Sequence, residues 1–367
     1  MAGWKTDRGV KWWMFPLAPA GLLFMGFWFR QEVPRARVGI NDFMGIYAGA
    51  RLVGTSEQFN ADAYLREQVR ATGWSAPSIL YTRLPAFAFV VRPLGQMQYL
   101  HAYYVWEALS LACFAGFLVL WPAPSREWLL VAACWSFPLF ADIFGGQDVA
   151  FVLLVLTVVW RWGPSRPFIA GAVLALAMLK FHLILLLPVF LIGQRRWRML
   201  AGLCCGAAVV VAGCFAVARA GWVPEYLRFV LQGQTNPSLR AMPNLHGLLE
   251  GLPHSLGYEV FGALVVTVAV WLSTQRASFS VGLSATLIGS ILVSHHSYPA
   301  DMLLLLPALL TLAFQERPRW FCVLLLSPLP FLVQAQVPLA EPLPILLIAL
   351  LVVLSVQCFK TGQSVLF

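Results

Sequence analysis

The sequence predicts an all-α integral membrane protein with many spanning segments, and three observations support this fold class. Hydrophobic residues make up 60% of the 367 residues and charged residues 11%, whereas soluble domains carry about 25% charged residues. Apolar runs near the ~18 residues that a spanning helix needs recur from one end of the chain to the other. The alternating ~10-residue segments that mark a membrane β-barrel are missing from the sequence. We therefore expect a single membrane domain over residues 1–367.

The net charge of +9 has a membrane explanation. In a soluble protein it would suggest nucleic acid, but in a membrane protein Lys and Arg collect in cytoplasmic loops and beside lipid headgroups. We expect membrane lipids as partners and no nucleic acid. Six of the seven cysteines lie in apolar segments without metal-ligand spacing, so we interpret them as small buried hydrophobic residues.

Basic residues near the start of the chain predict its orientation. Lys5, Arg8 and Lys11 favour a cytoplasmic N-terminus. The segment 12–29 that follows lacks a small-residue cleavage site, so we expect a retained helix in the plasma (inner) membrane. Alternating crossings give about twelve segments with both termini in the cytoplasm. The further segments expected are 98–120, 128–143, 149–160, 168–193, 199–218, 258–274, 279–294, 301–315, 319–336 and 342–359.

The apolar stretch 168–193 allows two interpretations. Basic residues precede it at Arg161 and Arg166 and follow it at Arg195 and Arg196, so a single crossing would leave one basic cluster outside. Two half-length segments that meet near Lys180 would keep both clusters inside, and broken helices are tolerated where they line a cavity within the protein. We favour the broken segment, with one long tilted helix as the alternative.

This topology places four polar pieces on the external side. They are the first external loop 30–97, the turn 142–148, the second large external loop 219–256 and the turn 294–301. Most of the polar chemistry of the chain lies in them. We therefore expect a functional surface that faces away from the cytoplasm, where nucleotide-activated substrates are not available.

The first external loop contains two expected short helices. The first is 42–53, with Asp42 or Asn41 at its N-cap, and the second is 60–71, capped by Asn60. Asp42 is an isolated acid after an apolar run, and it either caps the helix or carries a function. The loop also holds eight arginines, which either contact lipid headgroups or bind an anionic partner. They are Arg30, Arg35, Arg37, Arg51, Arg66, Arg70, Arg83 and Arg92.

Several segments, in order, resemble glycosyltransferase family 87. The stretch "NDFMGIYAGARLVGTSEQFNADAYL" looks like the opening signature of that family, with matches at Asp42, Phe43, Tyr47, Ala48, Ala50 and Arg51. "FGGQDVAFVLLVL" is similar to its Gly-Gln turn, "AGAVLALAMLKFHLILLLPVFLIGQRRWR" to its helix ending in Lys, and "MPNLHGLL" to a later external motif. The resemblance covers about residues 12–310. It implies a GT-C fold and transfer of a sugar from a polyprenyl-phosphate donor, often mannose.

Two stretches depart from the family pattern. Asp148 and Val149 follow Gln147 where the family often has Asn soon after Gly-Gln, and Thr82, Arg83 and Leu84 stand between Tyr81 and Pro85 where the family often has Tyr-Pro-Pro. These departures leave the fold unaffected and bear on which sugar and acceptor are used.

The resemblance implies Asp42 as the catalytic base of an inverting reaction. Transfer with inversion needs one carboxylate to take the acceptor proton, and positive groups to stabilise the departing phosphate. A charged Lys180 inside an apolar stretch is costly and therefore a functional candidate, with a snorkelling lysine as the alternative. Asp148 and Asp301 are the next acids to consider as base. The candidates for the donor phosphate are Lys180, Arg83, Arg240, His246, His295 and His296; those for sugar or acceptor are Tyr47, Arg51, Tyr81, Gln147 and Asn244.

The external acids are scattered and the adjacent histidines His295 and His296 lack helical i,i+4 spacing, so we expect neither a metal nor another cofactor. The sequence-based hypothesis is transfer of mannose, with arabinofuranose as the alternative sugar, to a lipid-linked or glycan acceptor. A secondary transporter or lipid flippase is the alternative of another class. Transporters usually show an internal repeat, and we find none in this sequence. A non-catalytic assembly subunit is the third possibility.

Overall fold

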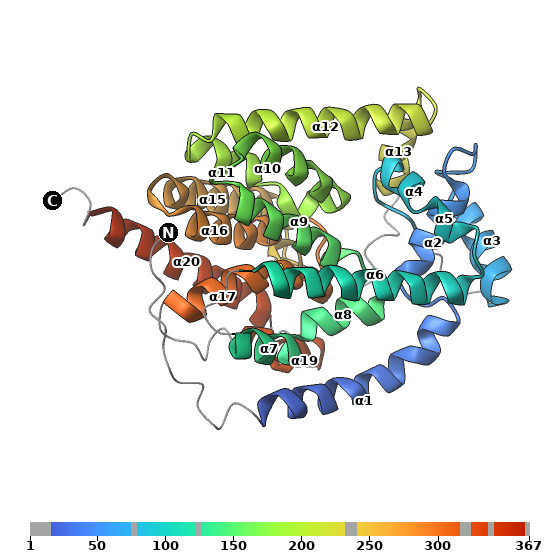
Figure 1. Ribbon diagram of the computed structural model, residues 1–367, viewed down its shortest axis with the longest axis horizontal. Coiled ribbons are helices and arrows are strands. Elements are labelled where there is room, and N and C mark those ends of the chain that lie inside the picture. Colours follow the sequence, from blue (N-terminus) through green and yellow to red (C-terminus); the bar gives the residue numbers. More distant parts are fainter. Residues whose placement is uncertain are drawn as a thin grey trace.

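The computed structural model of the chain is built from helices. It describes residues 16–74, 79–121, 126–231, 241–315, 324–336 and 341–363. Within these ranges every regular element is a helix. In Figure 1, α12 (Trp197–Val217) runs along one side and α1 (Leu17–Arg37) along the opposite side, with α6 (Tyr99–Leu120) and α9 (Val149–Trp162) between them.

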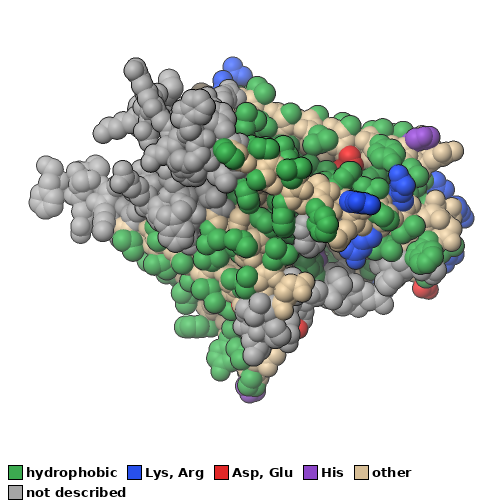
Figure 2. Space-filling model, turned by 90° about the horizontal axis from the view of Figure 1, so that it is seen from below, with side chains coloured by type: hydrophobic (Ala, Val, Ile, Leu, Met, Phe, Trp, Pro, Cys, Tyr) green, Lys and Arg blue, Asp and Glu red, His purple; other side chains and the backbone are tan. Residues whose placement is uncertain are grey.

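Four helical stretches are long and apolar enough to cross a membrane. They are α6, the run Pro167–Ile184, α12, and residues Ser255–Gln275 of α15 (Ser255–Arg276). Large apolar side chains on the outer faces of α12 and α15 are exposed, which would favour aggregation in water but suits a lipid environment. Figure 2 shows one face covered largely by hydrophobic side chains, with Lys and Arg gathered toward one end. The predicted all-α membrane fold is confirmed.

The first external loop folds as short helices. The expected helices 42–53 and 60–71 are confirmed as α2 (Phe43–Leu52) and α3 (Ala61–Thr72), and the Asn60 side chain accepts a hydrogen bond from the Asp62 backbone N–H, 3.0 Å. Two further short helices follow, α4 (Pro85–Val90) and α5 (Arg92–Gly95). The predicted end of the first helix at residue 29 is wrong. Helix α1 continues to Arg37, and Gly39, with φ +77°, lies in the turn that follows.

Two expected single segments are broken. Residues 128–143 form α7 (Arg126–Trp135) and α8 (Phe137–Gly145), because Ser136 caps the second helix and Pro138 lies in its first turn. Residues 301–315 form the 3₁₀ segment η4 (Pro299–Leu305) and α17 (Leu306–Gln315).

The break expected within 168–193 is present. The stretch consists of α10 (Pro167–Leu174), the 3₁₀ segment η2 (Ala175–Ile184) and α11 (Leu187–Gly193), and Lys180 has non-helical angles of φ −126° and ψ 60°. Of the expected segment 319–336, residues 319–323 lie outside the described ranges. The remaining helices are α13 (Trp222–Leu231), α14 (Leu245–Leu248), α16 (Phe279–Val293), α19 (Leu329–Gln336) and α20 (Pro342–Gln363).

Helix α10 packs against α12 through glycines. A Cβ at Gly171 would overlap the backbone of Met199, and a Cβ at Gly202 would overlap the backbone of Phe168. Close backbone approach through small residues is the usual way in which helices associate in lipid, where apolar burial supplies no driving force. This crossing anchors the start of the broken segment that carries Lys180.

We expect Gly202→Ala to destabilise the protein by about 1–3 kcal/mol, because the added methyl group forces the two backbones apart. The measurement is thermal unfolding of the detergent-purified protein. Gly26→Ala in α1 is the matched control, since a Cβ there meets nothing within 4 Å, and it should unfold at or slightly above the wild-type temperature. Equal unfolding temperatures for Gly202→Ala and wild type would contradict the close crossing.

Candidate active site

The turn between α8 and α9 is held from several sides. Gly146 adopts φ +64°, and a Cβ there would lie 2.6 Å from Phe43 Cβ. The indole N–H of Trp106 donates to the carbonyls of Gly146 and Gln147, at 3.2 and 3.1 Å. The Asp142 carboxylate accepts from the first two backbone N–H groups of α9, those of Val149 and Ala150, at 2.9 and 3.2 Å. These contacts fix the direction in which the side chains of Gln147 and Asp148 leave the turn.

Asp42 reaches this turn from the first external loop. It occupies the N-cap position of α2, yet its side chain makes no capping hydrogen bond. Its backbone N–H donates to the Gly145 carbonyl, 2.9 Å, and its Oδ2 accepts a hydrogen bond from Gln147 Nε2. The carboxylate is thus directed toward the turn and away from its own helix end. The Asp42 side chain therefore does not cap α2, which leaves the interpretation that it carries a function.

Arg83 and Asp148 form a buried bidentate ion pair. Arg83 Nε lies 2.8 Å from Asp148 Oδ2 and Nη2 lies 3.1 Å from Asp148 Oδ1. Arg83 Nη2 is also 3.4 Å from Gln147 Oε1. Two parallel hydrogen bonds between a guanidinium and a carboxylate fix orientation as well as charge. One residue from each of the two departures from the family pattern is therefore paired with the other.

Lys180 closes the same network from the break in η2. Its ammonium group donates to Asp301 Oδ1 at 2.6 Å and to Gln147 Oε1 at 2.7 Å, and it lies 3.3 Å from Asp148 Oδ1. The residue is only 4% exposed, so the snorkelling interpretation is wrong. Asp301 Oδ2 accepts from the backbone N–H of Tyr298, 2.8 Å, which leaves Asp301 held at both oxygens.

The charges in this network give its carboxylates different roles. With all groups ionised, three acids (Asp42, Asp148 and Asp301) face two cations (Arg83 and Lys180), a net charge of −1. Burial acts to raise the pKa of Asp148, but Arg83 and Lys180 outweigh it and lower that pKa to about 2. Burial raises the pKa of Asp42 above its ordinary value, against the opposing effect of the same two cations. Asp42 is therefore the more basic of these two carboxylates.

An apolar groove leads to this network. It has a volume of about 260 Å³. Its wall includes Tyr81 and Asp148 at the polar end and residues of α4, α6, α9 and η2 elsewhere. Val90 and Leu176, at its edge, are 73% and 50% exposed. The groove therefore opens at the outer surface of the helices, and its walls are mostly apolar.

The other predicted residues lie beside this network or apart from it. His246 and His295 both contact Glu259. Tyr81 is buried with its ring 5.9 Å from the Arg83 guanidinium carbon, so it flanks the network. Arg240 lies outside the described residues. Tyr47 and Arg51 line a cavity beside α3 and α5, Asn244 caps α14 and donates to the Ser294 carbonyl, and the His296 ring lies 5.7 Å from that of His182.

Sequence reasoning did not foresee Asp301 and Asp148 as the partners of Lys180 and Arg83. A signal was available, because a buried cation in an apolar segment requires an acid, and acids are scarce in the apolar part of this chain. The contact of Glu259, in the apolar helix α15, with two histidines was not predicted, because those histidines lie 13 and 36 residues away from it in the sequence.

Comparison with known protein families identifies the family of the chain. A sequence model of glycosyltransferase family 87 matches residues 81–307. The chain belongs to glycosyltransferase family 87. The match includes Arg83, Gln147, Asp148, Lys180 and Asp301 and begins after Asp42. Searches of curated proteins and of solved structures returned no match. As a family 87 member, the protein is a membrane glycosyltransferase, which favours the enzyme over the transporter or flippase alternative.

We expect Asp148→Asn to destabilise the family 87 protein by about 3–5 kcal/mol, because it leaves Arg83 as a buried charge without its partner. The double variant Arg83→Met/Asp148→Leu should recover much of that loss, since it removes both charges. Thermal unfolding in detergent measures both. A double variant no more stable than Asp148→Asn would show that the pair does not act as a unit.

Proposed function

We propose that the protein transfers mannose from a polyprenyl-phosphate donor to a lipid-linked or glycan acceptor, with inversion and with Asp42 as general base. The observation that carries this proposal is the position of the Asp42 carboxylate. It is free of its own helix end, retains some exposure, and is held by Gln147 beside the buried cations Lys180 and Arg83. The site faces the extracytoplasmic side of the plasma membrane in this proposal, and arabinofuranose remains the alternative sugar.

The bonds and protons of the proposed reaction balance with Asp42 as the proton acceptor. Asp42 takes the proton of the acceptor hydroxyl, the acceptor oxygen bonds to the anomeric carbon, and the bond from that carbon to the phosphate oxygen breaks. Polyprenyl phosphate leaves with the electron pair. Proton uptake by Asp42 changes the charge of the network from −1 to 0, which removes repulsion as negative charge develops on the leaving group. No metal is needed in this scheme.

The apolar groove supports a lipid-linked donor. A polyprenyl chain in it would be surrounded by apolar side chains of α4, α6, α9 and η2, and its phosphate end would lie near Asp148 and Arg83. Because Arg83 and Lys180 are already paired with Asp148 and Asp301, they supply a neutralised polar end to the groove. Direct contact of the phosphate with Lys180 would replace its bond to Gln147 Oε1.

We expect Asp42→Asn to slow sugar transfer at least ~100-fold, because the amide cannot accept the acceptor proton. The measurement is transfer of radiolabelled mannose from polyprenyl-phosphate-mannose to a mixed lipid extract by the purified protein. Asp62→Asn is the matched control, an exposed acid of the same external loop, and should transfer at the wild-type rate. Equal rates for Asp42→Asn and wild type would reject Asp42 as base.

The pH dependence of wild-type activity is a second test of Asp42 as the general base. Activity requires ionised Asp42, so kcat/KM should fall as pH decreases through a pKa above the ordinary aspartate value of about 3.9. If mannose is not transferred by wild type, the same assay with polyprenyl-phosphate-arabinofuranose separates the wrong sugar from the wrong reaction.

We expect Leu176→Trp to raise the KM for a long-chain polyprenyl donor several-fold, because the larger side chain fills the groove. A donor with a short lipid should be affected less. Leu185→Trp is the control, a similarly exposed leucine, 47% exposed, outside the groove. The comparison is steady-state kinetics with both donors. Equal KM changes for the two variants would place the donor lipid elsewhere.

A further inference from the structure

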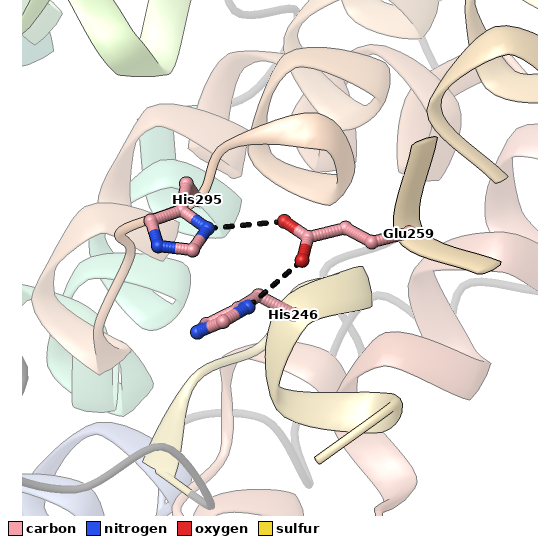
Figure 3. A group of neighbouring side chains, drawn as sticks. All are labelled: His246, Glu259 and His295. Carbon is pink, nitrogen blue, oxygen red and sulfur yellow. Dashed lines mark hydrogen bonds and ion pairs between the residues drawn. The ribbon is translucent and has the colours of Figure 1, made fainter. Parts of the chain in front are cut away.

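Two histidines and a glutamate from three separate segments meet at one point (Figure 3). His246 comes from α14, Glu259 from the first turns of α15, and His295 from the segment between α16 and η4. His246 Nδ1 lies 2.9 Å from Glu259 Oε2, and His295 Nδ1 lies 3.1 Å from Glu259 Oε1. The centroids of the two imidazole rings lie 3.9 Å apart, and the ring planes are inclined to each other by 49°. None of these residues takes part in the network around Asp42 and Lys180.

The ligand atoms of His246, Glu259 and His295 are close enough together to bind one metal ion after small side-chain movements. One possible ligand atom from each residue lies within 4.8 Å of the other two. Ligand atoms bound to a tetrahedral zinc ion at ~2.0–2.1 Å are roughly 3.3 Å apart, close to the two nitrogen–oxygen distances observed here. We propose that His246, Glu259 and His295 bind a divalent transition-metal ion of the zinc class.

The donor set selects the class of ion. Two imidazoles and one carboxylate suit zinc, whereas magnesium and calcium prefer oxygen ligands alone. His246 and Glu259 are mostly covered, with side chains 21% and 15% exposed, while His295 is 63% exposed. An ion can therefore enter from the side of His295. Three protein ligands leave a fourth position open for water.

The site has a positioning role, because its ligands connect to the Asp42 network through the backbone. His295 lies in the short segment that leads to Tyr298 and Asp301, and Tyr298 N–H holds the Asp301 carboxylate that binds Lys180. Asn244 Nδ2 donates to the Ser294 carbonyl, 2.7 Å, so α14 is already tied to this segment. A bound ion fixes the same segment to α15 as well. The proposal rests on this geometry and not on the sugar-transfer reaction.

The sequence indicated no metal because the ligands are far apart along the chain. Glu259 lies 13 residues after His246, and His295 lies 36 residues after Glu259. The adjacent pair His295 and His296 does not act together, since the His296 ring lies beside His182 and Tyr298. Such a site can be recognised only once the three segments are packed together.

The test is binding of cobalt and zinc to the full chain. The protein is purified in detergent with a tag free of histidine and cysteine, stripped with a chelator, and titrated with Co²⁺ while the visible spectrum is recorded. We expect one ion per chain, the absorption of a four-coordinate cobalt with nitrogen and oxygen ligands, and displacement by Zn²⁺. His295→Gln and Glu259→Gln should each weaken binding at least ~10-fold.

Three controls keep the result interpretable. His101→Ala removes an exposed histidine elsewhere, and Cys204→Ser/Cys205→Ser removes two exposed thiols that could bind metal; both should bind as wild type does. Because His295 is exposed, its glutamine variant should remain folded, and gel filtration verifies this. Zn²⁺ should raise the unfolding temperature of wild type and not of His295→Gln.

Binding that is unaffected by the His295 and Glu259 variants, or lost with the cysteine variant, would overturn the proposal. So would the absence of any stoichiometric binding by wild type, which would leave the three residues as a hydrogen-bonded cluster. These readouts do not involve sugar transfer, so failure here is distinct from failure of the proposed function.

Discussion

The arrangement of the helices around the site depends on one interaction, the pairing of the buried Lys180 ammonium group with acidic and amide oxygens. A charged side chain within the apolar part of a membrane protein costs about 2.5–3.5 kcal/mol by insertion measurements even with local adjustment. Lys180 meets this cost with two carboxylates and an amide oxygen that come from two other parts of the chain, the turn at Gln147 and Asp148 and the segment at Asp301. The turn after α8 and the 3₁₀ segment η4 both approach the break in η2 at this point. The charge of Lys180 therefore determines where these elements meet.

The break in the helix is what makes this meeting possible. Non-helical backbone angles at Lys180 release the chain from the regular ladder, and Leu186 N–H instead donates to Ser290 Oγ of α16, 3.2 Å. Backbone groups freed within a membrane must find such partners. The close glycine crossing of α10 and α12 holds the preceding part of the segment in place. The break is thus supported on both sides by packing and hydrogen bonds.

Local patterns predicted much of the fold, and long-range contacts explain what they missed. Apolar runs located α6, α9, α12, α15 and α16, the cap at Asn60 located α3, and basic flanks together with Lys180 indicated the broken segment. The same reasoning joined α7 and α8, because it gave too little weight to Ser136 and Pro138. The sequence could indicate that a buried Lys180 needs an acidic partner, but it could not identify Asp301 as that partner, since 121 residues separate them. Arg83 was predicted as a phosphate ligand and Asp148 as an alternative base, both at departures from the family pattern, but not as the ion pair that they form.

The amide of Gln147 separates the base from the cations that neutralise its surroundings. Its nitrogen donates to Asp42 and its oxygen accepts from Lys180, so the orientation of the amide is fixed by its two neighbours. A histidine or a carboxylic acid in this place could pass a proton from the ammonium group to Asp42. The Gln147 amide does not ionise near neutral pH. It therefore links Asp42 and Lys180 by hydrogen bonds but does not carry a proton between them. Asp42 is consequently kept in a field set by Lys180, while the only proton it can readily gain comes from the open side of the site.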